Sequence, residues 1–240
     1  MYLGESFNNR DIYVPYSEIS HTITSAASGS GKSVLLNLKL LSHLKNINLI
    51  DRLILCDFKG GVELNRYSNL NEKITFIDTM EDFIAMLEDL VKTMNERYQY
   101  LKSNSELKYH NDFIFLIIDE FGTIASFPKK EREHIFILLT LILQKGRACN
   151  LLTDFYLQKF DAQSVPTQIS VNFTSTTLMR SQSDYANSQL IGVQEEIKKI
   201  NNLEPIDFPI GRMIHKNGLT SEYSLVQVPY FQQDTYLNFI

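Results

Sequence analysis

The sequence predicts an α/β protein whose sheet is mainly parallel. Stretches typical of buried strands alternate along the chain with stretches whose apolar residues recur at helical spacing. A glycine-rich loop joins one predicted strand to one predicted helix, and an apolar run ends in two adjacent carboxylates. Ligands of open α/β sheets bind at the carboxyl ends of the parallel strands. We therefore expect the functional residues in the loops that follow those strands.

The composition of the 240 residues is that of an ordinary globular protein, with 44% hydrophobic and 21% charged residues. Its length predicts one domain, 1–240. Within it we expect a strand segment over 1–18 and a hairpin and tail over 205–240. The net charge of −5 argues against a protein coated with basic surface, but it leaves room for a local strip that contacts nucleic acid.

Cysteine usage and the apolar runs bear on the compartment. Cys56 and Cys149 are predicted to be free, buried thiols, because no metal-binding spacing surrounds them. No apolar run is long enough to span a bilayer, and the first residues lack the pattern of a signal peptide. We expect a cytoplasmic protein, or one associated with a membrane through segments or partners outside this chain.

Each predicted element follows from apolar periodicity and from the residues that break it. The predicted strands are 11–14, 22–24, 53–57, 74–77, 113–120, 151–158 and 174–179, with a hairpin of 212–215 and 224–228. The predicted helices are 34–45, 80–101, 133–145, which Gly146 ends, and 184–190, and a charged turn is predicted at 128–132.

The loop after the strand at 22–24 ends in Gly29-Ser30-Gly31-Lys32-Ser33, which matches a phosphate-binding loop. Small residues allow backbone N–H groups to surround an anion, and the N-terminus of the next helix adds a positive dipole end. Lys32 would reach the β- and γ-phosphates of ATP, and the Ser33 hydroxyl would ligate Mg²⁺. The predicted nucleotide-binding residues are Ala27, Ser28, Gly29, Ser30, Gly31, Lys32, Ser33 and Val34.

One position departs from the usual loop, because Ala26 replaces its first glycine. The methyl group is harmless if the backbone there has ordinary dihedral angles, and it costs about 1 kcal/mol if a left-handed conformation is needed. The alternative to a nucleotide site is a Ser/Gly turn that only precedes a helix.

Asp119 and Glu120 end the most apolar predicted strand. In a protein with a phosphate-binding loop, the first carboxylate holds Mg²⁺, usually through water, and the second polarises the attacking water as general base. We therefore predict Ser33 and Asp119 as metal-binding residues and Glu120 as a catalytic residue. The alternative is an acidic pair that simply starts a loop.

Gln158 and Arg147 are further catalytic candidates. Gln158 ends the next strand, where it would sense the γ-phosphate or orient water, although a surface role is the alternative. Arg147 follows a predicted helix and would reach a neighbouring subunit's site as an arginine finger, or it only complements the helix dipole. Asp57 and Lys59 end another strand, either near the site or as a structural ion pair. Weaker candidates for the finger are Arg180 and Arg212.

Further blocks follow one another in a fixed order over roughly residues 3 to 230. They are Leu3-Gly4-Glu5 with Asp11-Ile12, His21 before S-G-S-G-K-S-V, Asp57-Phe58-Lys59 with Glu63-Leu64 and Tyr67, Met94-Asn95-Glu96-Arg97-Tyr98, Ile117-Ile118-Asp119-Glu120-Phe121, Gln144-Lys145-Gly146-Arg147-Ala148, and Gln158-Lys159-Phe160-Asp161-Ala162 with Pro166-Thr167-Gln168-Ile169 and Asn172-Phe173. Together these blocks resemble the FtsK/SpoIIIE branch of the FtsK–HerA motor ATPases.

The resemblance implies a RecA-like P-loop NTPase fold with a mainly parallel central sheet flanked by helices. It implies an ATPase that uses ATP and Mg²⁺ to move double-stranded DNA and that assembles as a homo-oligomeric ring, usually a hexamer. The implied process is chromosome or plasmid segregation, or conjugative transfer. The G-G-V-E-L block is closest to coupling proteins of conjugative elements, which would add a relaxase or membrane-anchored transfer proteins as partners.

Several residues depart from the family pattern, including Leu157, Lys159 and Phe160 around the predicted sensor glutamine. Ala26 and the polar residues of the strand before Gln158 favour an alternative function, a nucleotide-binding adaptor or recruitment module with weak or no hydrolysis. A small-molecule kinase is a third interpretation, but no substrate-binding motif accompanies it. If the chain moves DNA, we expect the loops 122–130 and 160–168 to face it, through the basic residues Lys129, Lys130 and Lys159.

Overall fold

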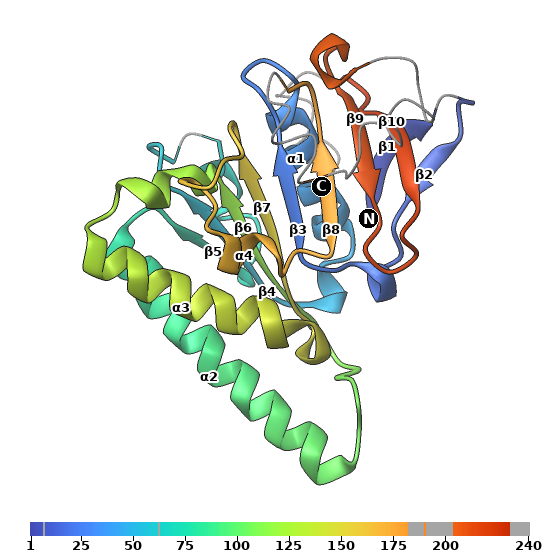
Figure 1. Cartoon of the computed structure of the whole chain (residues 1–240). Coiled ribbons are helices and arrows are strands. Elements are labelled where there is room, and N and C mark those ends of the chain that lie inside the picture. The colour runs from blue at the N-terminus through green and yellow to red at the C-terminus, as the bar shows by residue number, and fades with distance from the viewer. Residues whose placement is uncertain (7, 62, 182–189, 191–203, 231–240) are drawn as a thin grey trace. The chain divides into compact units, whose positions relative to one another are not determined.

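The computed structural model describes residues 1–6, 8–61, 63–181, 190 and 204–230, which fall into two compact units (Figure 1). Unit 1 comprises the described residues of Met1–Ile47, Tyr156–Asp161 and Thr174–Ile240. Unit 2 comprises those of Asn48–Phe155 and Ala162–Phe173. The predicted phosphate loop therefore lies in unit 1 and the predicted acidic pair in unit 2.

Unit 1 is built on strands in the order β2-β1-β10-β9-β8-β3. β3 and β8 pair in parallel, whereas β1, β2, β9 and β10 join through antiparallel pairings and β9 also pairs antiparallel with β8. Its elements are β1 (Tyr2–Ser6), β2 (Asp11–Tyr13), β3 (Thr22–Ser25), α1 (Lys32–Lys45), β8 (Ser175–Leu178), β9 (Arg212–Lys216) and β10 (Tyr223–Gln227), with short 3-10 turns η1 (Tyr16–Glu18) and η6 (Pro205–Asp207).

Unit 2 is built on strands in the order β7-β6-β4-β5, and all of these pairings are parallel. The last two residues of β7 belong to unit 1. The elements are β4 (Ile50–Asp57), β5 (Ile74–Ile77), α2 (Met80–Asn104), β6 (Phe113–Asp119), α3 (Lys129–Lys145), β7 (Leu151–Leu157) and α4 (Thr167–Ser170), with 3-10 turns η3 (Asn65–Tyr67), η4 (Phe121–Ser126) and η5 (Gly146–Cys149). A further turn, η2 (Ile47–Leu49), precedes β4.

Strand β6 lies inside the sheet of unit 2, between β7 and β4. This position suits its side chains, which are apolar on both faces as far as Ile118. After β6, the ring of Phe121 stacks on that of Phe155 in β7, with centroids 4.8 Å apart. Phe173 meets the same Phe155 ring edge-on at 5.3 Å. This aromatic cluster fixes the turn that carries the acidic pair.

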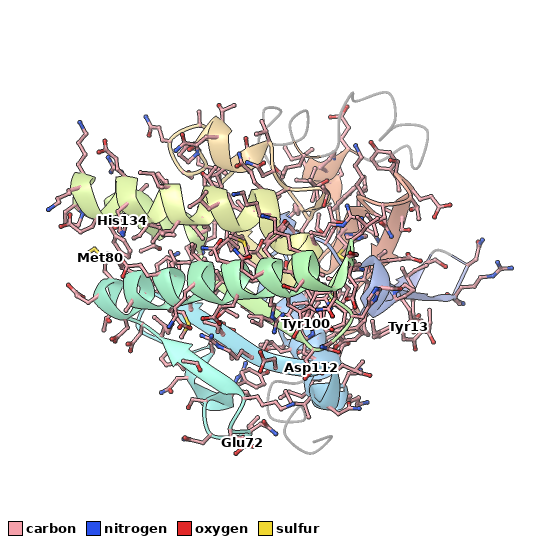
Figure 2. The ribbon with its side chains drawn as sticks, turned by 90° about the horizontal axis from the view of Figure 1, so that it is seen from below. Tyr13, Glu72, Met80, Tyr100, Asp112 and His134 are labelled. Atoms are coloured by element: carbon pink, nitrogen blue, oxygen red, sulfur yellow. The ribbon has the colours of Figure 1, made fainter. Side chains whose placement is uncertain are left out.

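Helices α2 and α3 lie side by side, and Figure 2 shows His134 of α3 and Met80 of α2 near the same end of the pair. Nε2 of His134 lies 2.9 Å from Oε1 of Glu88 in α2. The start of α2 is capped by Thr79, whose hydroxyl accepts a hydrogen bond from the backbone N–H of Asp82.

The predicted fold class is confirmed, with an antiparallel addition made by β1, β2, β9 and β10. The predicted helices at 34–45 and 80–101 and the strands at 53–57, 74–77 and 113–120 correspond to α1, α2, β4, β5 and β6. The predicted terminal hairpin is confirmed as β9 and β10. The two cysteines are free and buried, as predicted.

The charged turn predicted at 128–132 is wrong, because these residues form the first turn of α3. Pro128 is the N-cap and its carbonyl accepts from the N–H of Arg132 at 2.9 Å. A proline at a helix start and an acidic residue in the first turn both suit an N-terminus. Gly146 follows the end of α3 as predicted, but it has a helical φ of −59° and continues into η5.

Two sequence-based expectations meet the limits of the described residues. The helix predicted at 184–190 lies outside them except for Leu190. Among the residues that are described, no helix is both long and apolar enough to cross a membrane.

Candidate nucleotide-binding site

The loop between β3 and α1 has the backbone that its glycines predict. Gly29 has a φ of +70° and Gly31 a φ of +102°, a left-handed region that favours glycine. A Cβ atom on Gly31 would lie 3.1 Å from the backbone N of Gly211, so a side chain there would also require this backbone to shift by a few tenths of an ångström. Helix α1 begins at Lys32, so its first N–H groups follow the loop directly.

The start of the loop is fixed by backbone hydrogen bonds that it donates to the end of β7 and to the segment after β8. The N–H of Ala26 donates to the carbonyl of Leu157 at 3.0 Å, and that of Ala27 to the carbonyl of Arg180 at 2.9 Å. Ala26 is fully buried and is not among the described non-glycine residues with positive φ. The alanine at this position therefore fits its backbone without strain.

The end of the loop is fixed by the segment that precedes β9. The N–H of Gly211 donates to the carbonyl of Ser30 at 2.8 Å. Ser30 itself is fully buried, so it supports the loop rather than lining a surface. Along the open side, Nη2 of Arg180 donates to the carbonyl of Gly29 at 3.2 Å.

A cavity of about 310 Å³ lies against this loop. Seven of the eight predicted nucleotide-binding residues line it, all except Ser30. The lining residues are Ala26, Ala27, Ser28, Gly29, Gly31, Lys32, Ser33, Val34, Gln158 and Ile210. Backbone amides at a helix N-terminus, glycines with a left-handed backbone and a lysine suit a polyphosphate. The residues present therefore fit the phosphates of a nucleotide.

Gln158 is in unit 1 and lines the same cavity as the loop. It follows Leu157, whose carbonyl holds the start of the loop. A second cavity of about 380 Å³ lies beyond it. That cavity is lined by Ser25, Ala27, Ser28, Gln158, Lys159, Phe160 and Ser181. The structure thus brings the predicted sensor glutamine together with the predicted phosphate loop.

The acidic pair lies at the carboxyl end of β6 in unit 2, where Asp119 pairs in register with Asp57 of β4. Glu120 has a φ of +59°, which is uncommon for a residue other than glycine. Its carboxylate is nearly buried and its Oε2 lies 3.2 Å from Nζ of Lys59. The N–H of Lys59 donates to Oδ1 of Asp57 at 2.9 Å. The structure therefore joins the predicted Asp57 and Lys59 to the acidic pair.

The predicted magnesium ligands are divided between the units, with Ser33 in unit 1 and Asp119 in unit 2. Among the described residues, no cluster of three or more histidine, cysteine, aspartate or glutamate side chains forms a metal site. Each of the two residues offers oxygen, the kind of ligand that Mg²⁺ takes, and Mg²⁺ keeps several waters and binds phosphate oxygens as well.

Arg147 is not brought together with the acidic pair of its own unit. It lies in η5 before β7, and the backbone N–H of Ile114 at the start of β6 donates to Asn150 in that turn. Glu120 follows the opposite end of β6. The two are separated by the length of a seven-residue strand, about 20 Å.

The comparisons with known proteins agree with this geometry. A sequence profile described as "FtsK/SpoIIIE family" matches residues 1–149, which is more than half of the chain. The chain belongs to the FtsK/SpoIIIE family. Two relatives, each named "DNA translocase FtsK", are 28% identical over 170 residues in Staphylococcus aureus strain Mu50 and 27% identical over 199 residues in Corynebacterium efficiens.

The matches cover 62% and 72% of this FtsK/SpoIIIE-family chain, but only 21% and 20% of the two relatives. The matched part therefore spans about a fifth of the curated relatives' length. Among solved structures, the pCW3 conjugation coupling protein TcpA, in its monomer form with ATPgS, has a TM-score of 0.80 at 20% identity. That match covers the whole of this chain and 69% of TcpA.

A second solved structure with this fold is the cytoplasmic domain of the Type VII secretion ATPase EccC from Thermomonospora curvata. Its TM-score is 0.73 at 18% identity, over 97% of this chain and 28% of that one. These likenesses show the P-loop ATPase fold. The likenesses confirm the fold of this chain, and the roles of its individual residues stay predictions.

Two residues that lie at the loop were not predicted by any sequence motif. Ile210 and Gly211 follow the loop by almost 180 positions, and a Pro-Ile-Gly triplet carries no local sign of a nucleotide site. Arg180 was considered only as a finger toward a neighbour, whereas its side chain contacts its own loop.

Proposed function

We propose that residues 1–240 form one motor domain that hydrolyses ATP and uses the energy to move double-stranded DNA. The observation that carries the proposal is the loop cavity, in which left-handed glycines, Lys32 and Ser33 surround a space suited to phosphates. Membership of the FtsK/SpoIIIE family and relatives named DNA translocase support it.

In the proposed reaction, the backbone amides of the loop and Lys32 bind and orient the phosphates of ATP. Ser33 and Asp119 would hold Mg²⁺, which supplies charge neutralisation to the transferred phosphoryl group when bound. Glu120 accepts a proton from the attacking water, and Lys59 keeps its carboxylate oriented between turnovers. Gln158 orients that water at the start of the loop.

A ring of identical subunits, a hexamer in the proposal, explains the position of Arg147. Its side chain is exposed and lies at the opposite end of β6 from Glu120. An arginine so placed can serve hydrolysis only in another subunit's site, as a finger that stabilises the transition state. We therefore assign Arg147 to the neighbouring subunit's reaction.

The proposed DNA contacts are Lys129, Lys130 and Lys159. All three are exposed; Lys129 pairs with the exposed Glu133 at 3.8 Å, and Lys159 pairs with the half-buried Asp161 at 2.9 Å. Such surface pairs are weak enough to be exchanged for phosphates. The process we propose is conjugative transfer or chromosome and plasmid segregation, in the cytoplasm, with a relaxase or membrane-anchored transfer proteins as further partners.

The alternative, an adaptor that binds nucleotide without hydrolysis, loses one of its motives. Ala26 suggested a damaged loop, yet its backbone is not left-handed and its methyl group is accommodated in the core. Its other motive, the polar residues of β7, stands: Thr153 and Asp154 are both buried.

The experiment is ATP hydrolysis at several protein concentrations, with and without linear duplex DNA. We expect rates per subunit that rise with DNA and with protein concentration, because Arg147 acts between subunits. Lys32→Ala should weaken ATP binding and lower the turnover rate, each by more than 100-fold. ATP binding without turnover in the unaltered protein would favour the adaptor, and a Lys32→Ala variant with full activity would contradict the proposed site.

A further inference from the structure

The proposed site accounts for phosphates, but a nucleotide also has a base and a ribose. One large apolar side chain lies in the loop cavity, that of Ile210. It is 63% exposed, which is unusual for isoleucine and leaves most of its surface available. Ligand sites combine such apolar surface with a few fixed polar groups.

The two ends of the loop are held by different segments of unit 1. Ala26, at the start, is bonded to Leu157, the residue before Gln158. Ser30, near the end, is bonded to Gly211, the residue after Ile210. Gln158 therefore borders the start of the loop, and Ile210 borders the end that leads into α1.

This arrangement gives a bound nucleotide a direction. In the proposed function the terminal phosphate lies toward Gln158, because that side chain orients the attacking water. The phosphate chain then runs along the loop, and the nucleoside leaves it on the side of Val34 and Ile210. We propose that Ile210 is the platform on which the nucleoside of the bound nucleotide rests, an inference that builds on the proposed function.

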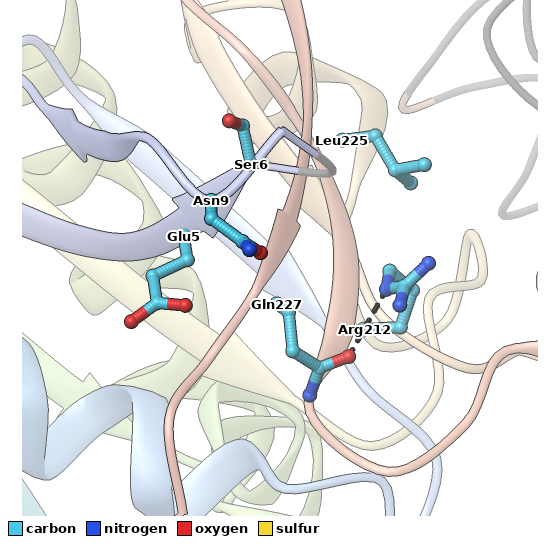
Figure 3. A pocket seen from close by; sticks show the side chains of 6 residues that line it. All are labelled: Glu5, Ser6, Asn9, Arg212, Leu225 and Gln227. Carbon is cyan, nitrogen blue, oxygen red and sulfur yellow. Dashed lines mark hydrogen bonds between the residues drawn. The ribbon is translucent and has the colours of Figure 1, made fainter.

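The backbone around Ile210 is rigid. Nε2 of Gln227 donates to the carbonyl of Ile210 at 3.0 Å, and Oε1 of the same side chain accepts from Nε of Arg212 at 3.0 Å, a bond drawn in Figure 3. The N–H of Val228 donates to the carbonyl of Gly211 at 2.9 Å. Gly211 has a φ of +81°, and a Cβ atom there would lie 2.7 Å from Nε2 of Gln227.

A rigid platform contributes affinity because little freedom is lost when the ligand arrives. An aliphatic side chain offers an apolar surface to a base or a ribose but no hydrogen bond. It therefore adds affinity for any nucleoside and little discrimination between bases. Inorganic tripolyphosphate, which has the phosphates but no nucleoside, gains nothing from it.

The test compares ATP with inorganic tripolyphosphate, with dissociation constants measured by calorimetry. Ile210→Ala should weaken ATP binding about tenfold and leave tripolyphosphate binding unchanged. Ile210→Leu should keep most of the affinity for ATP. The matched control is Ile206→Ala, another exposed isoleucine in the same segment, at 51%, which does not line the cavity and should change neither constant.

Two results would overturn the platform. One is an Ile210→Ala variant that binds ATP as well as the unaltered protein does. The other is an equal loss for ATP and tripolyphosphate, which would mean that the substitution disturbs the loop itself. Lys32→Ala separates these from a failure of the proposed function: it should weaken both ligands, and if it weakens neither, the phosphate site and the platform fall together.

Discussion

Two turns that follow strands carry the predicted functional groups. Both contain residues with a left-handed backbone, but they present different groups. The loop after β3 presents backbone groups, and two of its glycines have the left-handed conformation. The turn after β6 presents a side chain, and it places a glutamate, Glu120, in the conformation that usually needs glycine. The first turn avoids strain by omitting side chains. The second accepts a cost of about 1 kcal/mol to aim a carboxylate.

The comparison also separates how each turn is supported. Main-chain hydrogen bonds hold the loop after β3: the carbonyls of Leu157 and Arg180 accept from it, and the N–H of Gly211 donates to it. A lysine ion pair and the stacked rings of Phe121 and Phe155 accompany the turn after β6. Backbone support is insensitive to most substitutions, whereas side-chain support can be altered one residue at a time. This difference predicts where substitutions separate binding from chemistry.

The largest expected effect is on hydrolysis through the second turn. Glu120→Gln keeps the shape of the side chain but removes the base, so turnover should fall by about 10² to 10⁴ with ATP affinity nearly unchanged. Steady-state hydrolysis and calorimetric binding on the same preparation measure both. Equal losses in the two quantities would mean that Glu120 acts in binding, and the contrast between the turns would fail.

Next is the loop itself. Gly31→Ala combines a φ of +102° with a contact of 3.1 Å to the backbone of Gly211, so we expect a loss of about 2 to 3 kcal/mol in stability and at least tenfold weaker ATP binding. The control is Gly60→Ala, at a φ of +95° with no atom within 4 Å of the added carbon. It should cost only about 1 kcal/mol. Urea unfolding of the two variants measures the difference, and similar losses would show that contact with Gly211 is unimportant.

The stability of unit 1 should depend on acid. Unit 1 holds His43 and His215, and burial, with Lys39 nearby, lowers the pKa of each to about 3. In the unfolded chain these histidines bind protons with a pKa near 6.5. The free energy of unfolding therefore keeps its full value above that pH and falls as the pH drops toward 3.

Replacing a buried histidine should flatten that dependence. His215→Gln should reduce the pH slope of the free energy of unfolding by up to about 1.4 kcal/mol per pH unit below pH 6. Urea unfolding at a series of pH values is the measurement, and a slope unchanged by His215→Gln would show that this histidine is already protonated in the folded chain.

The smallest expected effect concerns the position where the loop departs from its usual pattern. Ala26→Gly should not improve ATP affinity, because the backbone there is not left-handed. It should lower stability by about 1 kcal/mol, since it removes a fully buried methyl group and loosens the unfolded chain. Tighter ATP binding by this variant would show that the alanine limits the site.

The sequence was sufficient for features that are local. Glycine spacing identified the loop after β3, and continuous apolar runs identified β4 and β6. Pairings between distant segments carried no such signal. Nothing around Lys59 indicates that it reaches Glu120, and nothing around Gln227 indicates that it fixes Ile210 beside the loop.

The local sequence pattern also failed to predict elements whose residues are largely polar or interrupt an apolar run. The charged residues after Pro128 were interpreted as a turn, although a solvent-facing first helical turn has the same composition. The residues of strand β1 show no strand pattern of their own, because Gly4 and Glu5 interrupt the apolar sequence, and Leu3-Gly4-Glu5 enters the prediction only as one of the blocks that resemble the family. Its Gly4 lies so close to β10 that a Cβ atom would clash with Gln227.

The hydrogen bond from Gly211 to Ser30 has a consequence for the synthesis of the protein on the ribosome. The phosphate loop is translated almost 180 residues before the segment that closes its end, and Val228 then secures that segment. A nascent chain that has not yet released residue 228 lacks a finished nucleotide site. A chain truncated before residue 228 should therefore neither retain nucleotide nor compete for it with a chain that contains this segment.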